Sequence, residues 1–149
     1  MSESLLSSLH AGRRVYGIAV DDAHHFKRPW DPSASSPGHG WVYVRSAALE
    51  PRPLVDALER GDFYSSTGVV LDAVDVGRDR LRIAVKPTGF SKYRIQFIGR
   101  GGRVLQESAA TEGSYTFKGD EGYVRAKVLE SNGAVAWTQP VGIGAQAPR

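Results

Sequence analysis

A change of pattern at residue 69 constrains the fold of this chain more than any other feature of its sequence. From Val69 onward, short segments of alternating apolar and polar residues are separated by turn residues. Val124, Ala126 and Val128, for example, alternate with charged residues. Repeated short segments with a period of two predict antiparallel strands that bury one face. We therefore expect residues 69–140 to form a small antiparallel β-sandwich.

Two glycine-containing turns support this interpretation. Gly101-Gly102 and Asn132-Gly133 each separate two strand-like segments, and Asn-Gly between alternating segments is the strongest short-range signal for a β-hairpin. After Pro140 the chain becomes rich in Gly, Ala and Pro, so that residues 141–149 are expected to form a flexible tail.

The first part of the chain mixes helical and strand patterns, and we expect residues 1–68 to be a piece of an α/β domain. In the helix predicted over residues 53–60, Leu54, Val55 and Leu58 form an apolar stripe, and Gly61 follows as a stop signal. The predicted elements are a helix over Ser2–His10, a buried strand over Arg14–Val20, a strand over Trp41–Arg45 and the helix over Pro53–Arg60.

The densest cluster of potential ligand side chains follows the first predicted strand. Asp21, Asp22, His24 and His25 place two carboxylates and two imidazoles within five residues. Ligands of α/β folds bind at the carboxyl ends of strands, and mixed oxygen and nitrogen ligands suit zinc, manganese or iron. On an extended chain, Asp22 and His24 point to the same side. A surface loop in which an Asp caps a turn explains the same residues equally well.

The segment Gly17–Phe26 (GIAVDDAHHF) resembles the last metal-binding motif of the polymerase-and-histidinol-phosphatase (PHP) family of metal-dependent phosphoesterases. Residues 37–49 and 55–69, which contain FYSSTG, resemble the segments that close the barrel in one branch of that family, and residues 122–141 resemble the end of its appended β-domain. The resemblance implies a partial PHP-type (β/α) barrel unit followed by the β-sandwich.

The resemblance also implies roles for individual residues. Asp22 and His24 would be metal ligands, in a cluster of metals that activates water to hydrolyse a phosphate ester. Asp21 and His25 would orient ligands or contact phosphate, although a solvated role fits His25 equally well. The family's other motifs, beginning with an N-terminal H-x-H, are absent. We therefore expect a truncated chain that holds a divalent metal weakly and is inactive alone, so no residue is assigned as catalytic.

Residues near the cluster are further candidates for the substrate site. Lys27 and Arg28 could bind a phosphate, and Trp30 could line the substrate mouth or anchor its loop. Tyr64 and Ser65 could reach the same mouth, but packing beneath the barrel is the favoured interpretation of their segment.

Composition narrows the remaining possibilities. The chain has no cysteine, which excludes disulfides and thiol nucleophiles, and its longest apolar runs have strand length, so we expect no membrane span and a cytoplasmic protein. The net charge of +3 arises mainly after residue 70, and a solvated strand face explains it better than nucleic-acid binding.

Expected partners are a phosphate-ester substrate and a second chain, either a copy of this one or the missing barrel half. The alternative function is a non-catalytic β-sandwich module that binds a carbohydrate, a nucleic acid or a protein and keeps a vestigial metal motif.

Overall fold

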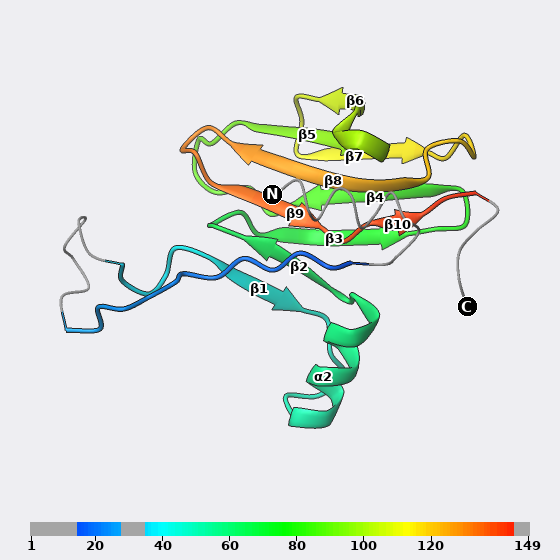
Figure 1. The fold of residues 1–149 in the computed structure, drawn as a ribbon. Coiled ribbons are helices and arrows are strands. Elements are labelled where there is room, and N and C mark those ends of the chain that lie inside the picture. Colours follow the sequence, from blue (N-terminus) through cyan, green and yellow to red (C-terminus); the bar gives the residue numbers. More distant parts are fainter. Residues whose placement is uncertain (1–14, 28–34, 145–149) are drawn as a thin grey trace.

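The structure, a computed structural model, describes residues 15–27 and 35–144. Within them lie two antiparallel β-sheets, one α-helix and a short 3-10 turn (Figure 1). The prediction of antiparallel sheets is confirmed, whereas the helix predicted over residues 2–10 lies outside the described part. The elements are β1 (Trp41–Val44), α2 (Pro51–Arg60), β2 (Phe63–Ser66), β3 (Leu71–Val76), β4 (Arg80–Val85), β5 (Tyr93–Ile98), η1 (Arg100–Gly102), β6 (Val104–Ser108), β7 (Glu112–Thr116), β8 (Tyr123–Glu130), β9 (Val135–Thr138) and β10 (Val141–Gly142).

The larger sheet has seven strands. Its order is β1-β2-β9-β8-β5-β6, and β10 pairs with β8 beside this path. Both predicted hairpins are confirmed: η1 joins β5 to β6, and the turn at Asn132-Gly133 joins β8 to β9. Gly133 has a φ of +95°, a conformation that residues with a side chain rarely adopt. Because β2 pairs with β9, this sheet contains strands from both sides of the boundary predicted at residue 68.

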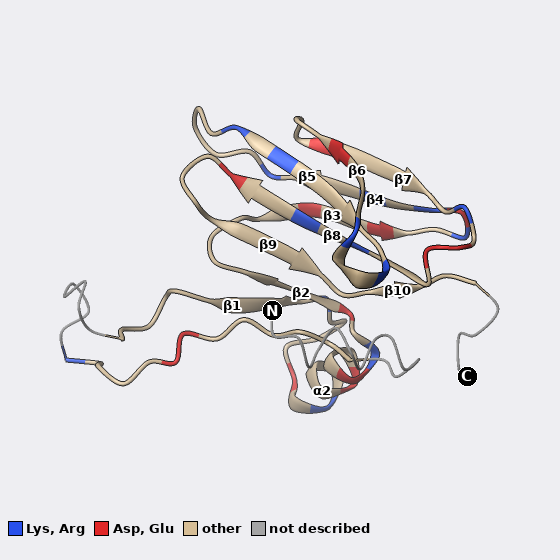
Figure 2. Cartoon of the chain, turned by 45° about the horizontal axis from the view of Figure 1, so that its top comes forward, with Lys and Arg blue, Asp and Glu red and all other residues tan. Residues whose placement is uncertain are grey.

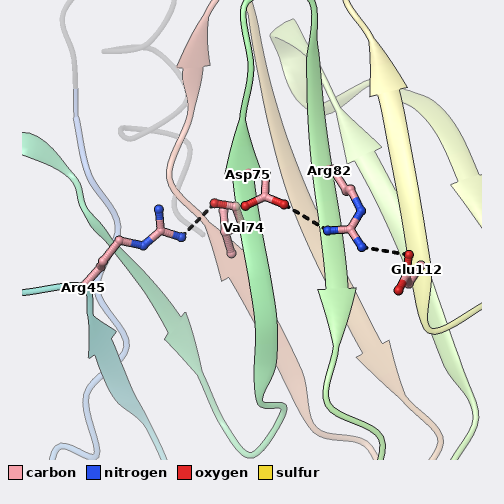
Figure 3. Close-up of polar contacts among 5 residues, drawn as sticks. All are labelled: Arg45, Val74, Asp75, Arg82 and Glu112. Atoms are coloured by element: carbon pink, nitrogen blue, oxygen red, sulfur yellow. Dashed lines mark hydrogen bonds and ion pairs between the residues drawn. The ribbon is translucent and has the colours of Figure 1, made fainter.

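The smaller sheet has three strands in the order β3-β4-β7. On its exposed face, the guanidinium of Arg82 donates to Asp75 Oδ2 at 2.9 Å and to Glu112 Oε2 at 3.0 Å, so that one side chain links all three strands (Figure 3). Arg45, just after β1, donates to the carbonyl of Val74 in β3 at 2.9 Å. This bond connects the end of β1 to the smaller sheet.

The hydrophobic core lies between the two sheets, as in a β-sandwich. Phe97, Leu81 and Ile83 are among its largest fully buried side chains, and the ring of Phe97 stacks on that of Tyr115 with centroids 5.9 Å apart. Alternation puts every second residue of each central strand into this core. The members of the core cluster are Val69, Leu71, Leu81, Ile83, Val85, Tyr93, Ile95, Phe97, Tyr115, Val124, Ala126, Val128 and Ala136.

Helix α2 connects β1 to β2 and confirms the helix predicted there. Prolines occupy its first turn, and Gly61 ends it in the left-handed conformation, with φ of +79°. The buried face differs from the predicted stripe, because Ala57 is buried whereas Val55 and Leu58 are exposed. In the described part of the chain, no helix is long and apolar enough to cross a membrane.

The prediction of a buried strand before the acidic cluster was wrong for residues 15–20. These residues form no strand, and the side chains of Ile18 and Val20 are 65% and 68% exposed. The segment instead runs as an extended chain beside β1 and β2 (Figure 1). Among the described residues, no strand forms a regular ladder of hydrogen bonds with it.

At the other end, strand pairing continues beyond Pro140 into the segment predicted as a flexible tail. Val141 and Gly142 pair with Val124 and Tyr123 of β8, and the N–H of Ile143 donates to the carbonyl of Gly122 at 3.0 Å. The sheet therefore includes the start of the predicted tail, whereas residues 145–149 lie outside the described residues.

Candidate functional site

The extended segment 15–20 is attached to the larger sheet by two side chains. The Gln139 amide accepts from the N–H of Gly17 at 3.0 Å and donates to its carbonyl at 2.9 Å. The Ser65 hydroxyl donates to the same carbonyl at 2.9 Å and accepts from the N–H of Ala19 at 3.1 Å. Side chains of β2 and of the residue after β9 thus satisfy backbone groups that a neighbouring strand would otherwise satisfy.

Asp21 fixes the path of the chain on both sides of the loop that leads to β1. Its Oδ1 accepts from the backbone N–H groups of His39 and Gly40, at 2.5 and 2.6 Å. Backbone donors, of which Gly38 contributes most, hold the pKa of Asp21 below its usual range despite partial desolvation. This carboxylate therefore acts as an ionised anchor for residues 38–40, immediately before the predicted metal ligands.

The structure brings the two predicted metal ligands together. Asp22 Oδ1 lies 3.8 Å from His24 Nε2, and the side chains are 89% and 64% exposed. Asp22 has a positive φ of 52°, which Asp tolerates better than most residues. Below, these two residues are called the Asp22–His24 pair. Both side chains therefore lie largely in solvent.

The remaining candidates around the pair are exposed or lie outside the described residues. The N–H groups of His24 and His25 both donate to the carbonyl of Ser35, at 2.8 and 3.0 Å, which holds the backbone while the side chains of His25 and Lys27 remain exposed. Arg28 and Trp30 lie outside the described residues. Within residues 15–27 and 35–144, no group of three or more His, Cys, Asp or Glu side chains converges on one point.

Tyr64 and Ser65 make internal contacts in β2. The Tyr64 hydroxyl accepts from the N–H of Leu71 at 3.0 Å, and its ring stacks on that of Tyr43 with centroids 4.8 Å apart. Burial raises the pKa of Tyr64. Ser65 is buried and bonded to Gly17 and Ala19. Both hydroxyls therefore serve the attachment of neighbouring segments.

A cavity of about 500 Å³ lies between segment 15–20 and the outer face of the larger sheet. Arg125 of β8 lines it and is only 7% exposed, and its Nε and Nη1 have no hydrogen-bond partner among the described residues. The sequence pattern assigned Arg125 to a solvated strand face. Alternation in β8 shows which residues lie on opposite faces of the sheet, but it does not show what packs over each face. The position of segment 15–20 over Arg125 could therefore not be predicted from this pattern.

The fold and the site define a β-sandwich protein in which an extended N-terminal segment crosses one sheet and ends in an exposed Asp–His pair. Comparison with protein-family models, with curated proteins and with solved structures gives no match for this chain.

Proposed function

We propose that this chain is the C-terminal, metal-binding portion of a PHP-type metal-dependent phosphoesterase and that it is inactive by itself. The observation that carries the proposal is the Asp22–His24 pair. Its 3.8 Å separation is close to the roughly 3–3.5 Å expected between two ligands that share an ion at bond lengths near 2.1 Å. Rotation of two exposed side chains covers the difference.

The chemistry assigned to the pair follows from its donor types. A carboxylate oxygen and an imidazole nitrogen suit zinc, manganese or iron, and such an ion can lower the pKa of a bound water and hold the oxygens of a phosphate ester. Two protein ligands leave most positions of the ion to water, so its affinity is low. Further ligands from another polypeptide segment would be needed to hold an ion firmly and to orient a substrate.

Exposed apolar side chains on segment 15–20 and on α2 support the idea of a missing layer. Ile18 and Val20 on the extended segment, and Val55 and Leu58 on α2, are all exposed. Apolar groups on an extended segment and on a helix beside a sheet are those that a completed partial PHP-type barrel would cover. The proposed cover is a barrel half that supplies the remaining metal ligands.

The proposal is tested by metal binding. Purified chain is loaded with Zn²⁺ or Mn²⁺, and binding is measured by calorimetry and by elemental analysis of the equilibrated protein. We expect one weakly held ion per chain, lost in Asp22→Ala/His24→Ala and retained in the matched control Asp120→Ala, which removes an exposed loop carboxylate. Binding that survives the double substitution, or no binding by the wild type, would contradict the proposed metal site and favour a non-catalytic binding module.

The phosphoesterase assignment needs its own measurement. Hydrolysis of 4-nitrophenyl phosphate should stay at the background rate of free metal for the chain alone. Addition of a polypeptide that carries the H-x-H barrel half should produce hydrolysis that depends on Asp22 and His24. Hydrolysis by the chain alone, unchanged by the double substitution, would refute the assignment of these residues.

A further inference from the structure

The cavity beneath segment 15–20 contains one charged group whose hydrogen-bonding capacity is unused. Arg125 is buried there with Nε and Nη1 unpartnered among the described residues. A buried guanidinium without an acceptor costs free energy, because it has lost its hydration and gained no bond in return. An acceptor supplied by a ligand would remove this cost.

Apart from Trp137, the other polar side chains that line the cavity already make hydrogen bonds. Gln139 and Ser65 bond to Gly17, as described above, and Thr138 Oγ1 accepts from the N–H of Ala126 at 2.8 Å. Thr67 Oγ1 accepts from the N–H of Val135 at 2.9 Å. Among the lining residues, Arg125 and the indole N–H of Trp137 therefore have unused donors, and the hydroxyl of Tyr123, near Arg125, is unpartnered as well.

The charge of the cavity is positive and uncompensated by its lining. Among the described lining residues there is no Asp or Glu, and His39 is the other basic residue. The Asp21 carboxylate adjoins the lining through its hydrogen bonds from the N–H groups of His39 and Gly40. Elsewhere on the two sheets, Lys and Arg are interspersed with Asp and Glu (Figure 2). Desolvation lowers the pKa of Arg125, opposed by nearby Tyr123, and a guanidinium keeps its proton in proteins even when buried. An anion would remove this electrostatic penalty.

The remainder of the cavity is apolar. Val15, Ile18, Val20, Trp137 and Pro140 belong to its lining. Its volume of about 500 Å³ falls within the range of roughly 300–1,000 Å³ found for sites of small organic ligands. A guanidinium matches the two oxygens of a carboxylate or phosphate, and the indole of Trp137 suits a flat apolar body.

We propose that this cavity binds a small organic anion, whose carboxylate or phosphate group pairs with Arg125 while its apolar body lies between segment 15–20 and Trp137. The site is separate from the Asp22–His24 pair. It requires no metal, so it stands or falls independently of the proposed phosphoesterase function.

The test is a titration of the full chain followed by NMR, with EDTA present to exclude metal. Three probes are used: benzoate, phenyl phosphate and the neutral benzyl alcohol. Saturable shifts of the Trp137 indole N–H and the Gly17 amide are expected with one or both anions and not with benzyl alcohol. The anion that saturates at the lower concentration identifies the class of head group.

Substitutions then locate the binding energy. Arg125→Met should weaken anion binding at least tenfold, and Arg125→Lys should weaken it less. The matched control Arg94→Met removes an exposed guanidinium of β5 and should leave binding unchanged, as should Asp22→Ala/His24→Ala. Intermolecular NOEs in the wild type place the probe directly, even where an Arg125 variant fails to fold. Lack of saturation with both anions, equal binding of benzyl alcohol, undiminished binding by Arg125→Met, or NOEs to another surface would each overturn the proposal.

Discussion

Glu121, in the loop between β7 and β8, offers the sharpest test of how this sandwich is stabilised. Its carboxylate is 1% exposed. Oε1 accepts from the hydroxyl of Tyr115 at 2.9 Å and from the N–H of Lys118 at 2.6 Å, and Oε2 accepts from the N–H of Gly119 at 2.9 Å. This buried carboxylate thus accepts hydrogen bonds both from the backbone of the turn at residues 118–119 and from the hydroxyl of the core residue Tyr115.

Glu121→Gln keeps the size of the side chain and removes its charge. The amide oxygen can replace Oε1, but the NH₂ group then faces the N–H of Gly119, which loses its acceptor. An orphaned buried donor costs about 1–3 kcal/mol, and hydrogen bonds to a charged group contribute about 1.5–3 kcal/mol each, somewhat more than neutral ones. We expect Glu121→Gln to lower the free energy of unfolding by about 2–4 kcal/mol at pH 7.

The effect should depend on pH. Burial raises the pKa of Glu121, but its backbone and tyrosine donors outweigh burial, so that the folded pKa lies below the usual 4.5. The stabilisation is therefore complete above the unfolded pKa of about 4.5 and disappears as the pH falls through the folded pKa. The difference in stability between wild type and Glu121→Gln should shrink as the solution is acidified through this window.

Urea unfolding followed by circular dichroism, at pH 7 and at successively lower pH, measures this difference. The matched control is Glu107→Gln, which removes an exposed carboxylate from β6 that lies 3.5 Å from Arg94. Exposed ion pairs contribute about 0–1 kcal/mol, so the control should change little. A cost for Glu121→Gln that equals that of the control, or one that is constant with pH, would refute the account of Glu121 as an ionised, buried acceptor.

Two further substitutions examine the attachments around the site. Asp21→Asn should speed amide hydrogen exchange at His39 and Gly40, because the ionised acceptor of both N–H groups is weakened; unchanged exchange rates by NMR would show that other contacts hold the loop. Tyr64→Phe should cost about 1–2 kcal/mol in urea unfolding, because the N–H of Leu71 loses its acceptor while the stack on Tyr43 remains; a neutral result would mean that water replaces the hydroxyl.

The sheet part of the fold could be predicted because its signals are local. Alternation in β8 and the Asn132-Gly133 turn depend on neighbours in sequence, and the structure has both a strand and a hairpin there. For α2, the sequence predicted the helix but not the face that is buried. Periodicity correctly identified a helix but gave the wrong buried face, since Val55 and Leu58 are exposed. Which face is buried depends on what packs against the helix, and local sequence does not specify that partner.

The candidate sites also show that local sequence does not specify which distant segments pack together. Asp22 and His24 were predicted by residue type and by their spacing on an extended chain. Their side chains lie 3.8 Å apart, but Asp22 has a φ of +52°, so the backbone there is not extended as expected. Arg125 was missed because it alternates with core residues like any solvated residue. Its burial requires a cover contributed by residues more than 100 positions earlier in the chain. A long-range contact of this kind leaves no signal in either segment alone.

Segment 15–20 contributes to both candidate sites, the Asp22–His24 pair and the Arg125 cavity. Its apolar residues predict a strand, yet a strand needs a partner edge, and in the described structure Ser65 and Gln139 satisfy its backbone at Gly17 and Ala19 instead. The same attachment places the segment as one wall of the Arg125 cavity and leads the chain into Asp21, which anchors the loop before β1. The position of the Asp22–His24 pair and the burial of Arg125 therefore share a physical cause. A partner that paired with this segment as a strand would change the environment of both sites at once.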